Sequence, residues 1–297
     1  MVILPYLLIL SATFVHYGES MMIKLYNKKF ASGGFMFISI VSLFSLLFFV
    51  FKYLLFDTVK TDFTPAVIPY AIAGGVMYAA SSVLVFFAVR IGSLAITNLI
   101  LGYSTVVNTL FGIIFLKESS NAYTYIGIAI MVLAIFLLKK PEEKSKEAKK
   151  TSLLWFILAL LGMLTSASYG ILSKLQQVAF NNAVDSEFAM IAIGFSFVAT
   201  FIISILMDRK QALYVLKTCV PYAAPAGLCN GGTNLLSFIY NPMLPYSIAS
   251  PTRSLSTKIF HFIMGSCVFK ERYTKKQLLG LILICFAVVL INIAKYI

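Results

Sequence analysis

The chain has 297 residues, of which 60% are hydrophobic and 12% are charged, and its mean hydropathy is +0.91. A soluble globular domain averages about 45–50% apolar and about 25% charged residues. The composition therefore excludes an ordinary water-soluble globule and indicates an integral membrane protein. The net charge of +13 does not indicate a nucleic-acid partner, because the basic residues gather between apolar runs.

The apolar runs are about 20 residues long, the length that a helix needs to cross a hydrocarbon core of ~30 Å. Backbone polar groups in lipid must bond internally, so each run is predicted to be a helix. We therefore predict an all-α membrane protein with ten transmembrane helices, expected in a bacterial cytoplasmic membrane. The runs lie near residues 2–25, 33–56, 66–89, 94–115, 121–140, 152–178, 187–208, 219–240, 245–269 and 275–296.

The only long connector, residues 141–151, is rich in charges and separates residues 1–140 from residues 152–297. Most Lys and Arg residues follow the first, third, fifth, seventh and ninth runs, and cytoplasmic loops carry such an excess. With ten crossings, this bias predicts that both termini lie outside the cell.

The two halves resemble each other when the sequence is shifted by 153 residues. The shift aligns Gly74 with Gly227, Lys117-Glu118 with Lys270-Glu271, and Gly127 with Gly280. Each half has five crossings, an odd number, so the second half enters the membrane from the opposite side. The sequence therefore predicts a five-plus-five inverted repeat, an architecture common in secondary transporters.

The duplication, the length and two short motifs resemble the drug/metabolite transporter superfamily, of the EamA-type ten-helix kind. The motifs are Phe115-Leu116-Lys117-Glu118 ahead of Gly127, and Phe269-Lys270-Glu271 ahead of Gly280. The resemblance implies a secondary transporter without naming its solute. It also implies termini in the cytoplasm, against the charge bias, so the orientation stays open.

The ninth run has one polar, cationic face. At 100° per residue, seven of its polar side chains fall within an arc of about 140°. They are Ser247, Ser250, Arg253, Ser254, Thr257, Lys258 and His261. Ionisable residues inside a membrane usually face a bundle interior or water, so Arg253, Lys258 and His261 are predicted to bind substrate. The alternative is that Lys258 pairs with helix carbonyls or with Glu19.

Amide side chains offer a neutral surface beside these cations. Asn230, Asn234, Ser237 and Asn241 are spaced four, three and four residues apart and share one helix face. Amides both donate and accept hydrogen bonds, so Asn230, Asn234 and Asn98 are further predicted substrate ligands. Equally, these residues could hold neighbouring helices together.

The first run carries a buried acid, Glu19, one turn from His16. An acid and a histidine in apolar surroundings can load and release a proton, so this pair is predicted as a proton-coupling site. The alternative is that Glu19 lies near the membrane interface, solvated or paired.

These observations predict a secondary active transporter that moves a small anionic or zwitterionic metabolite, such as an amino acid or organic acid, by alternating access. One alternative is a proton-coupled exporter of cationic or hydrophobic drugs; another is a membrane-embedded transferase or flippase. No enzyme motif or metal-spaced Cys and His set is present, so we expect no catalytic activity, cofactor or metal. The oligomeric state stays open.

Overall fold

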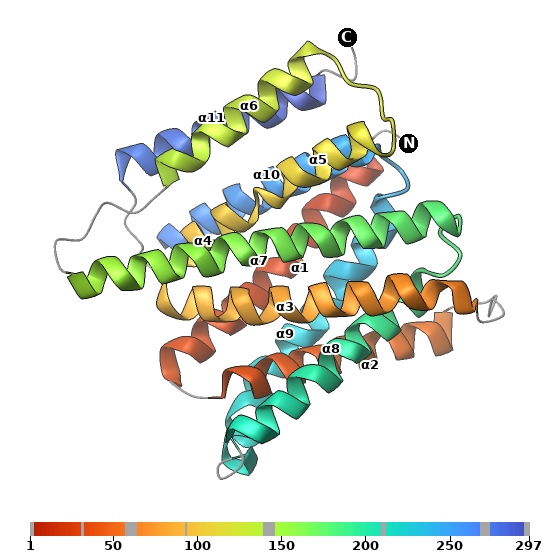
Figure 1. Cartoon of the computed structure of the whole chain (residues 1–297), viewed down its shortest axis with the longest axis vertical. Coiled ribbons are helices and arrows are strands. Elements are labelled where there is room, and N and C mark those ends of the chain that lie inside the picture. The colour runs from red at the N-terminus through yellow and green to blue at the C-terminus, as the bar shows by residue number, and fades with distance from the viewer. Residues whose placement is uncertain are drawn as a thin grey trace.

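The computed structural model describes residues 3–30, 33–56, 64–92, 94–138, 146–208, 212–267 and 274–293. Within these ranges the regular structure is entirely helical (Figure 1). The helices are α1 (Leu4–Lys29), α2 (Gly34–Phe56), the short 3-10 helix η1 (Pro65–Val67), α3 (Ile68–Ile91), α4 (Leu94–Leu101), α5 (Ser104–Ile114), α6 (Ala122–Leu138), α7 (Lys146–Ala179), α8 (Asp185–Asp208), α9 (Ala212–Tyr240), α10 (Tyr246–Cys267) and α11 (Lys275–Ile293).

The helices follow the predicted runs with three differences. The fourth run is not one helix but two, α4 and α5, which are separated at residues 102–103. α7 begins at Lys146, inside the segment expected to be a linker, because residues 146–150 are mostly good helix formers. α9 begins at Ala212, seven residues before the predicted start.

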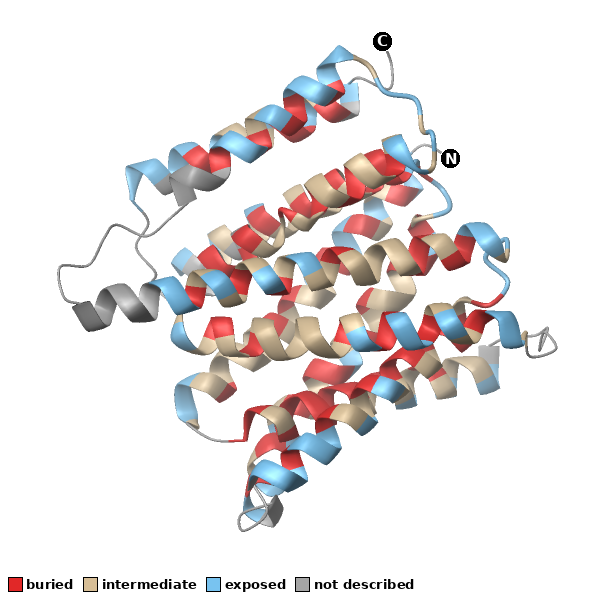
Figure 2. Cartoon of the chain, viewed as in Figure 1, coloured by how far each residue is buried: buried red, intermediate tan, exposed pale blue. Residues whose placement is uncertain are grey.

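The surface of the bundle is apolar, as a lipid environment requires. Large apolar side chains such as Phe14, Leu133 and Leu206 are exposed. Figure 2 shows exposed residues along the outer helices of the bundle. Among the described residues, four helical segments are long and apolar enough to span a bilayer: Gly34–Leu55, Pro65–Ile91, Leu153–Ala179 and Asp185–Met207. The other six predicted crossings stay predictions.

Helix packing comes in pairs that correspond under exchange of the halves. α1 packs on α9 as α7 packs on α3, and α2 packs on α9 as α8 packs on α3. Three further pairs join each helix to its own counterpart: α2 with α8, α5 with α10, and α6 with α11 (Figure 1). This pairing supports the predicted inverted repeat.

Glycines allow the corresponding helices to approach closely. A Cβ atom on Gly227 of α9 would lie 2.5 Å from the carbonyl oxygen of Val41 in α2. A Cβ atom on Gly75 of α3 would lie 2.9 Å from the carbonyl oxygen of Ala192 in α8. Gly74 of α3, the aligned counterpart of Gly227, packs on Phe188 of α8. The aligned residues Gly74 and Gly227 therefore lie in corresponding helix contacts, α3 with α8 and α9 with α2.

Candidate functional site

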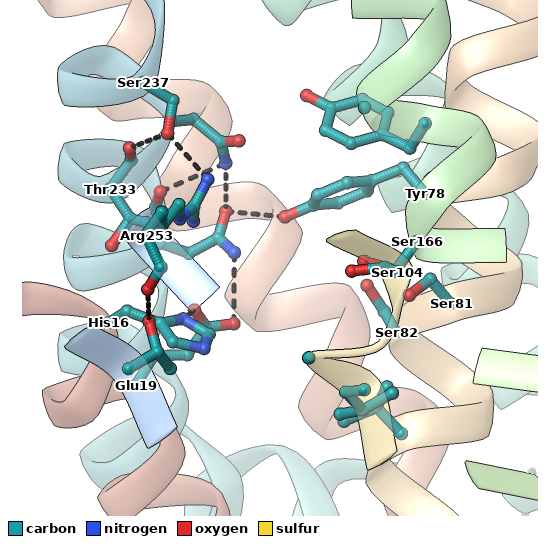
Figure 3. Close-up of a pocket in the computed structure, with 18 of the residues that line it drawn as sticks. His16, Glu19, Tyr78, Ser81, Ser82, Ser104, Ser166, Thr233, Ser237 and Arg253 are labelled. Carbon is teal, nitrogen blue, oxygen red and sulfur yellow. Dashed lines mark hydrogen bonds and ion pairs between the residues drawn. The ribbon is translucent and has the colours of Figure 1, made fainter. Parts of the chain in front are cut away.

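A cavity of about 300 Å³ lies between the two halves of the chain. Residues of α1, α2, α3, α4 and α5 line it from the first half, and residues of α7, α9 and α10 line it from the second. Figure 3 shows that charged and amide side chains from α1, α9 and α10 occupy one wall, while Tyr78 and several serines face them. The site is therefore built jointly by both halves.

Most of the residues predicted from the sequence as site residues lie on this one cavity. The lining includes His16, Glu19, Asn98, Asn230, Asn234 and Arg253. Lys258 is not part of the lining. The side chain of His261 lies outside the described residues, although its backbone is part of α10.

Asn230 joins the two walls of the cavity. Its Oδ1 accepts hydrogen bonds from the Tyr78 hydroxyl at 2.5 Å, from Ser45 Oγ at 2.9 Å and from Asn234 Nδ2 at 3.0 Å. Its Nδ2 donates to Glu19 Oε1 at 3.0 Å. Asn230 therefore links helices, as the alternative interpretation predicted, and it also lines the cavity. Its role as a substrate ligand stays a prediction.

Glu19 lies at the cavity wall with two polar neighbours. One carboxylate oxygen accepts the bond from Asn230, and the other lies 3.3 Å from His16 Nδ1. The side chains of Glu19 and His16 are 14% and 30% exposed. Glu19 is thus paired, and it faces the cavity. The proton-coupling role of Glu19 and His16 stays a prediction.

Arg253 is the positive charge of the cavity. Its Nη1 donates to Ser237 Oγ at 2.9 Å, and Ser237 itself donates to the carbonyl oxygen of Thr233. Among the described residues, no carboxylate lies within ion-pair distance of Arg253. A guanidinium presents five donors in a fork that matches a carboxylate, so Arg253 retains donors for a solute.

Lys258 lies behind the cavity wall. It is 1% exposed, and its Nζ lies 4.7 Å from the centre of the Tyr103 ring with no hydrogen-bond partner among the described residues. The alternative in which Lys258 pairs with Glu19 or with helix carbonyls is therefore not observed. An aromatic ring stabilises a cation by about 0.5–2 kcal/mol, less than the several kcal/mol that burying an ion costs. Its role as a direct substrate ligand stays a prediction.

Two charged residues that were not predicted as site residues bind backbone groups at one end of the cavity. Glu118 accepts hydrogen bonds from the backbone N–H groups of Tyr246 and Ser247 at 2.7 and 2.8 Å, and so caps the N-terminus of α10. Lys174 donates to the carbonyl oxygen of Asn241 at 3.2 Å and lies over the Tyr246 ring. Both fix the turn between α9 and α10, and Glu118 is the acid of the first Lys-Glu motif.

Other cavity residues were not predicted from the sequence, because they are small or aromatic. Ser81, Ser82, Ser104 and Ser166 bring hydroxyl groups to the wall that faces Asn230 (Figure 3). They lie within apolar runs, where hydropathy hides isolated hydroxyls.

Polar atoms of three further lining residues are buried without a hydrogen-bond partner among the described residues. These atoms are Asn98 Nδ2, Asn108 Oδ1 and the hydroxyl of Tyr169. A solute or water could supply their partners.

Comparison with known proteins places the chain among transporters. The model of the EamA-like transporter family matches residues 153–293, and this match confirms the resemblance to the drug/metabolite transporter superfamily. The family consists of membrane transporters of small molecules, and the chain is accordingly an integral membrane transporter with a small-molecule substrate.

A solved crystal structure has the same fold, with a TM-score of 0.62 and 12% sequence identity. The alignment covers 96% of this chain and 98% of that one. No curated protein matches the chain.

Proposed function

We propose that the protein is a secondary active transporter of small zwitterionic metabolites of the amino-acid type, acting in a bacterial cytoplasmic membrane. The halves, residues 1–140 and 152–297, would rock against each other as an inverted repeat and expose the cavity to each side in turn. The location of the cavity between helices of both halves supports this motion. The sequence alone allowed an anionic or a zwitterionic solute.

One observation favours the zwitterion: the charges that line the cavity balance. Among the described lining residues, Arg253 carries a positive charge and Glu19 a negative charge, with His16 beside Glu19. Lys258, which would have made the cavity cationic, is not part of the lining. A carboxylate on Arg253 and an ammonium on Glu19 would each meet an opposite charge in a site largely shielded from water.

The spacing of these two charges limits the solute. Glu19 binds Asn230 and Arg253 binds Ser237, seven residues further along the same helix. At a rise of ~1.5 Å per residue the two attachment points lie about 10 Å apart along α9. Both side chains are long enough to shorten this gap, so the preferred distance between amino and carboxylate groups is a measurable property of the site.

A thermal-shift series tests the proposal. The purified protein is heated with glycine, 4-aminobutyrate, 6-aminohexanoate and lysine, and with the matched acid and amine that carry one charge each. A ligand that binds only the folded state raises the unfolding midpoint. We expect zwitterions to raise it, and Arg253→Gln and Glu19→Gln each to remove the rise. Arg90→Gln is the control, because Arg90 does not line the cavity. A rise with organic acids alone, or with zwitterions in both variants, contradicts the proposal.

A second candidate, a proton-coupled exporter of cationic drugs, has one supporting observation: Glu19 faces the cavity beside His16. In that case hydrophobic cations raise the midpoint, Glu19→Gln removes the rise, and Arg253→Gln leaves it in place. The same series therefore separates the two functions.

A further inference from the structure

Lys258 packs into the break between α4 and α5. Ser254, one turn before it on α10, donates a hydrogen bond to the carbonyl oxygen of Gly102 at 2.7 Å. Gly102 is in contact with the Lys258 chain itself, because a Cβ atom at position 102 would overlap the Lys258 Cε atom. The Nζ atom then lies over the ring of Tyr103, the next residue of the break. Gly102 and Tyr103 thus form the packing site of the Lys258 side chain, called here the lysine pocket.

The lysine pocket contains no acid among the described residues. Tyr103 itself belongs to an apolar cluster with Met131 and Ile284, against which Leu255 packs. Two titratable groups act on the amine, the Tyr103 hydroxyl and the thiol of Cys285 in α11. On its own helix, Arg253 precedes it and His261 follows it, the latter with a side chain outside the described residues. Within the part of the chain that the structure describes, this fully buried amine has no counter-charge.

A thin wall separates the amine from the cavity. Gly102, Ser254 and Thr257 line the cavity, yet they also surround or immediately precede Lys258. The Ser254–Gly102 hydrogen bond joins α10 of the second half to the break in the first half. If the halves move apart at this contact, cavity water reaches Nζ directly.

We propose that Lys258 is the proton-binding residue of the transporter. When α10 lies against the break, the amine is uncharged and sealed. When α10 and the break separate, the nitrogen lone pair takes a proton from water in the cavity and an N–H bond forms. When they close again, the proton returns to water. This proposal rests on the proposed alternating access, and it leaves Glu19 as a solute anchor.

The protein carries its own reporter of this motion. Trp155 is the only tryptophan in the chain, and its Nε1 donates to Thr97 Oγ1 of α4 at 2.9 Å. Movement of α4 therefore changes the surroundings of the indole. Tryptophan fluorescence of the purified protein in lipid nanodiscs, titrated without solute over about pH 5 to about pH 10, follows the state of the break.

We expect one reversible fluorescence transition in the unaltered protein and none in two variants of Lys258. Lys258→Met cannot take a proton and should keep the high-pH spectrum at every pH. Lys258→Arg is always charged and should keep the low-pH spectrum. The opposite fixed spectra distinguish a lost proton site from general damage, which would shift both variants the same way.

Control variants test other titratable groups. Glu19→Gln, Cys285→Ser and His261→Gln each remove one such group, and each should retain the transition. Lys174→Met removes another buried lysine, bound to the carbonyl of Asn241, and should also retain it. The proposal is overturned if the unaltered protein shows no transition, if either Lys258 variant still titrates, or if Glu19→Gln or His261→Gln abolishes it. Because no solute is present, failure here leaves the thermal-shift result unaffected.

Discussion

At the scale of single residues, the cavity depends on Asn230, which accepts three hydrogen bonds and donates one to Glu19. Asn230→Leu would leave Tyr78, Ser45 and the Glu19 carboxylate without these partners. A buried polar group left unsatisfied costs about 1–3 kcal/mol, so we expect the free energy of unfolding to fall by at least that amount.

Reversible unfolding in mixed micelles measures the loss at Asn230. The matched control is Asn234→Leu in the same helix face, which removes one donor to Asn230 and should cost about 1 kcal/mol or less. Equal losses in the two variants would show that Asn230 is not the link between the walls of the cavity.

Helical periodicity predicted which residues lie on the polar faces, but not what each of them contacts. Arg253 and Lys258 are five residues apart, which places them about 140° apart around α10. They therefore stand at opposite edges of the same polar arc: Arg253 reaches the cavity and Lys258 reaches the break. Which neighbouring helix contacts each edge of the arc depends on tertiary packing. The spacing of polar residues carries no information about that packing.

At the scale of helices, Glu118 fixes the start of α10. Its carboxylate accepts two backbone N–H bonds at the positive end of the helix dipole, where a negative charge is stabilising. We expect Glu118→Ala to lower the free energy of unfolding by about 1–2 kcal/mol. Glu118→Gln keeps one acceptor oxygen without the charge and should lose about half as much.

Thermal and denaturant unfolding of both Glu118 variants check this order. Because α10 also carries Arg253, Glu118→Ala should weaken zwitterion binding in the thermal-shift series, while Lys117→Ala, the adjacent charge, should not. A Gln variant as damaging as the Ala variant would mean that the cap acts only through its charge.

The positions of the helices were predictable, since each is a long apolar run, but the break between α4 and α5 was not. The fourth run contains no charged residue and no proline, and a glycine within such a run does not by itself end a helix. The break is stabilised from the other half of the chain, through the bond from Ser254 to the carbonyl of Gly102. The two partners are 152 residues apart in sequence, so no local pattern could indicate it.

At the scale of the whole molecule, glycine substitution can test whether the corresponding helix contacts of the two halves are equivalent. α9 lies on α2 at Gly227, and α3 lies on α8, the corresponding helix pair, at Gly75, which follows Gly74, the aligned counterpart of Gly227. In both places a Cβ atom would meet a backbone carbonyl oxygen, at 2.5 and 2.9 Å. Backbone cannot rotate away as a side chain can, so the helices themselves must separate.

We expect Gly227→Ala and Gly75→Ala each to lower the free energy of unfolding by about 1–3 kcal/mol, the usual cost of overpacking a tight contact. Gly194→Ala in α8 is the matched control, because its Cβ would lie 3.8 Å from Leu46, an ordinary contact distance. Alanine is the better helix former by about 1 kcal/mol, so this variant should be neutral or slightly stabilised. Losses at Gly227 and Gly75 with none at Gly194 would support equivalent interfaces between the halves. A loss at only one of the two would mean that the repeat has diverged there, and that the halves do not move about equivalent contacts.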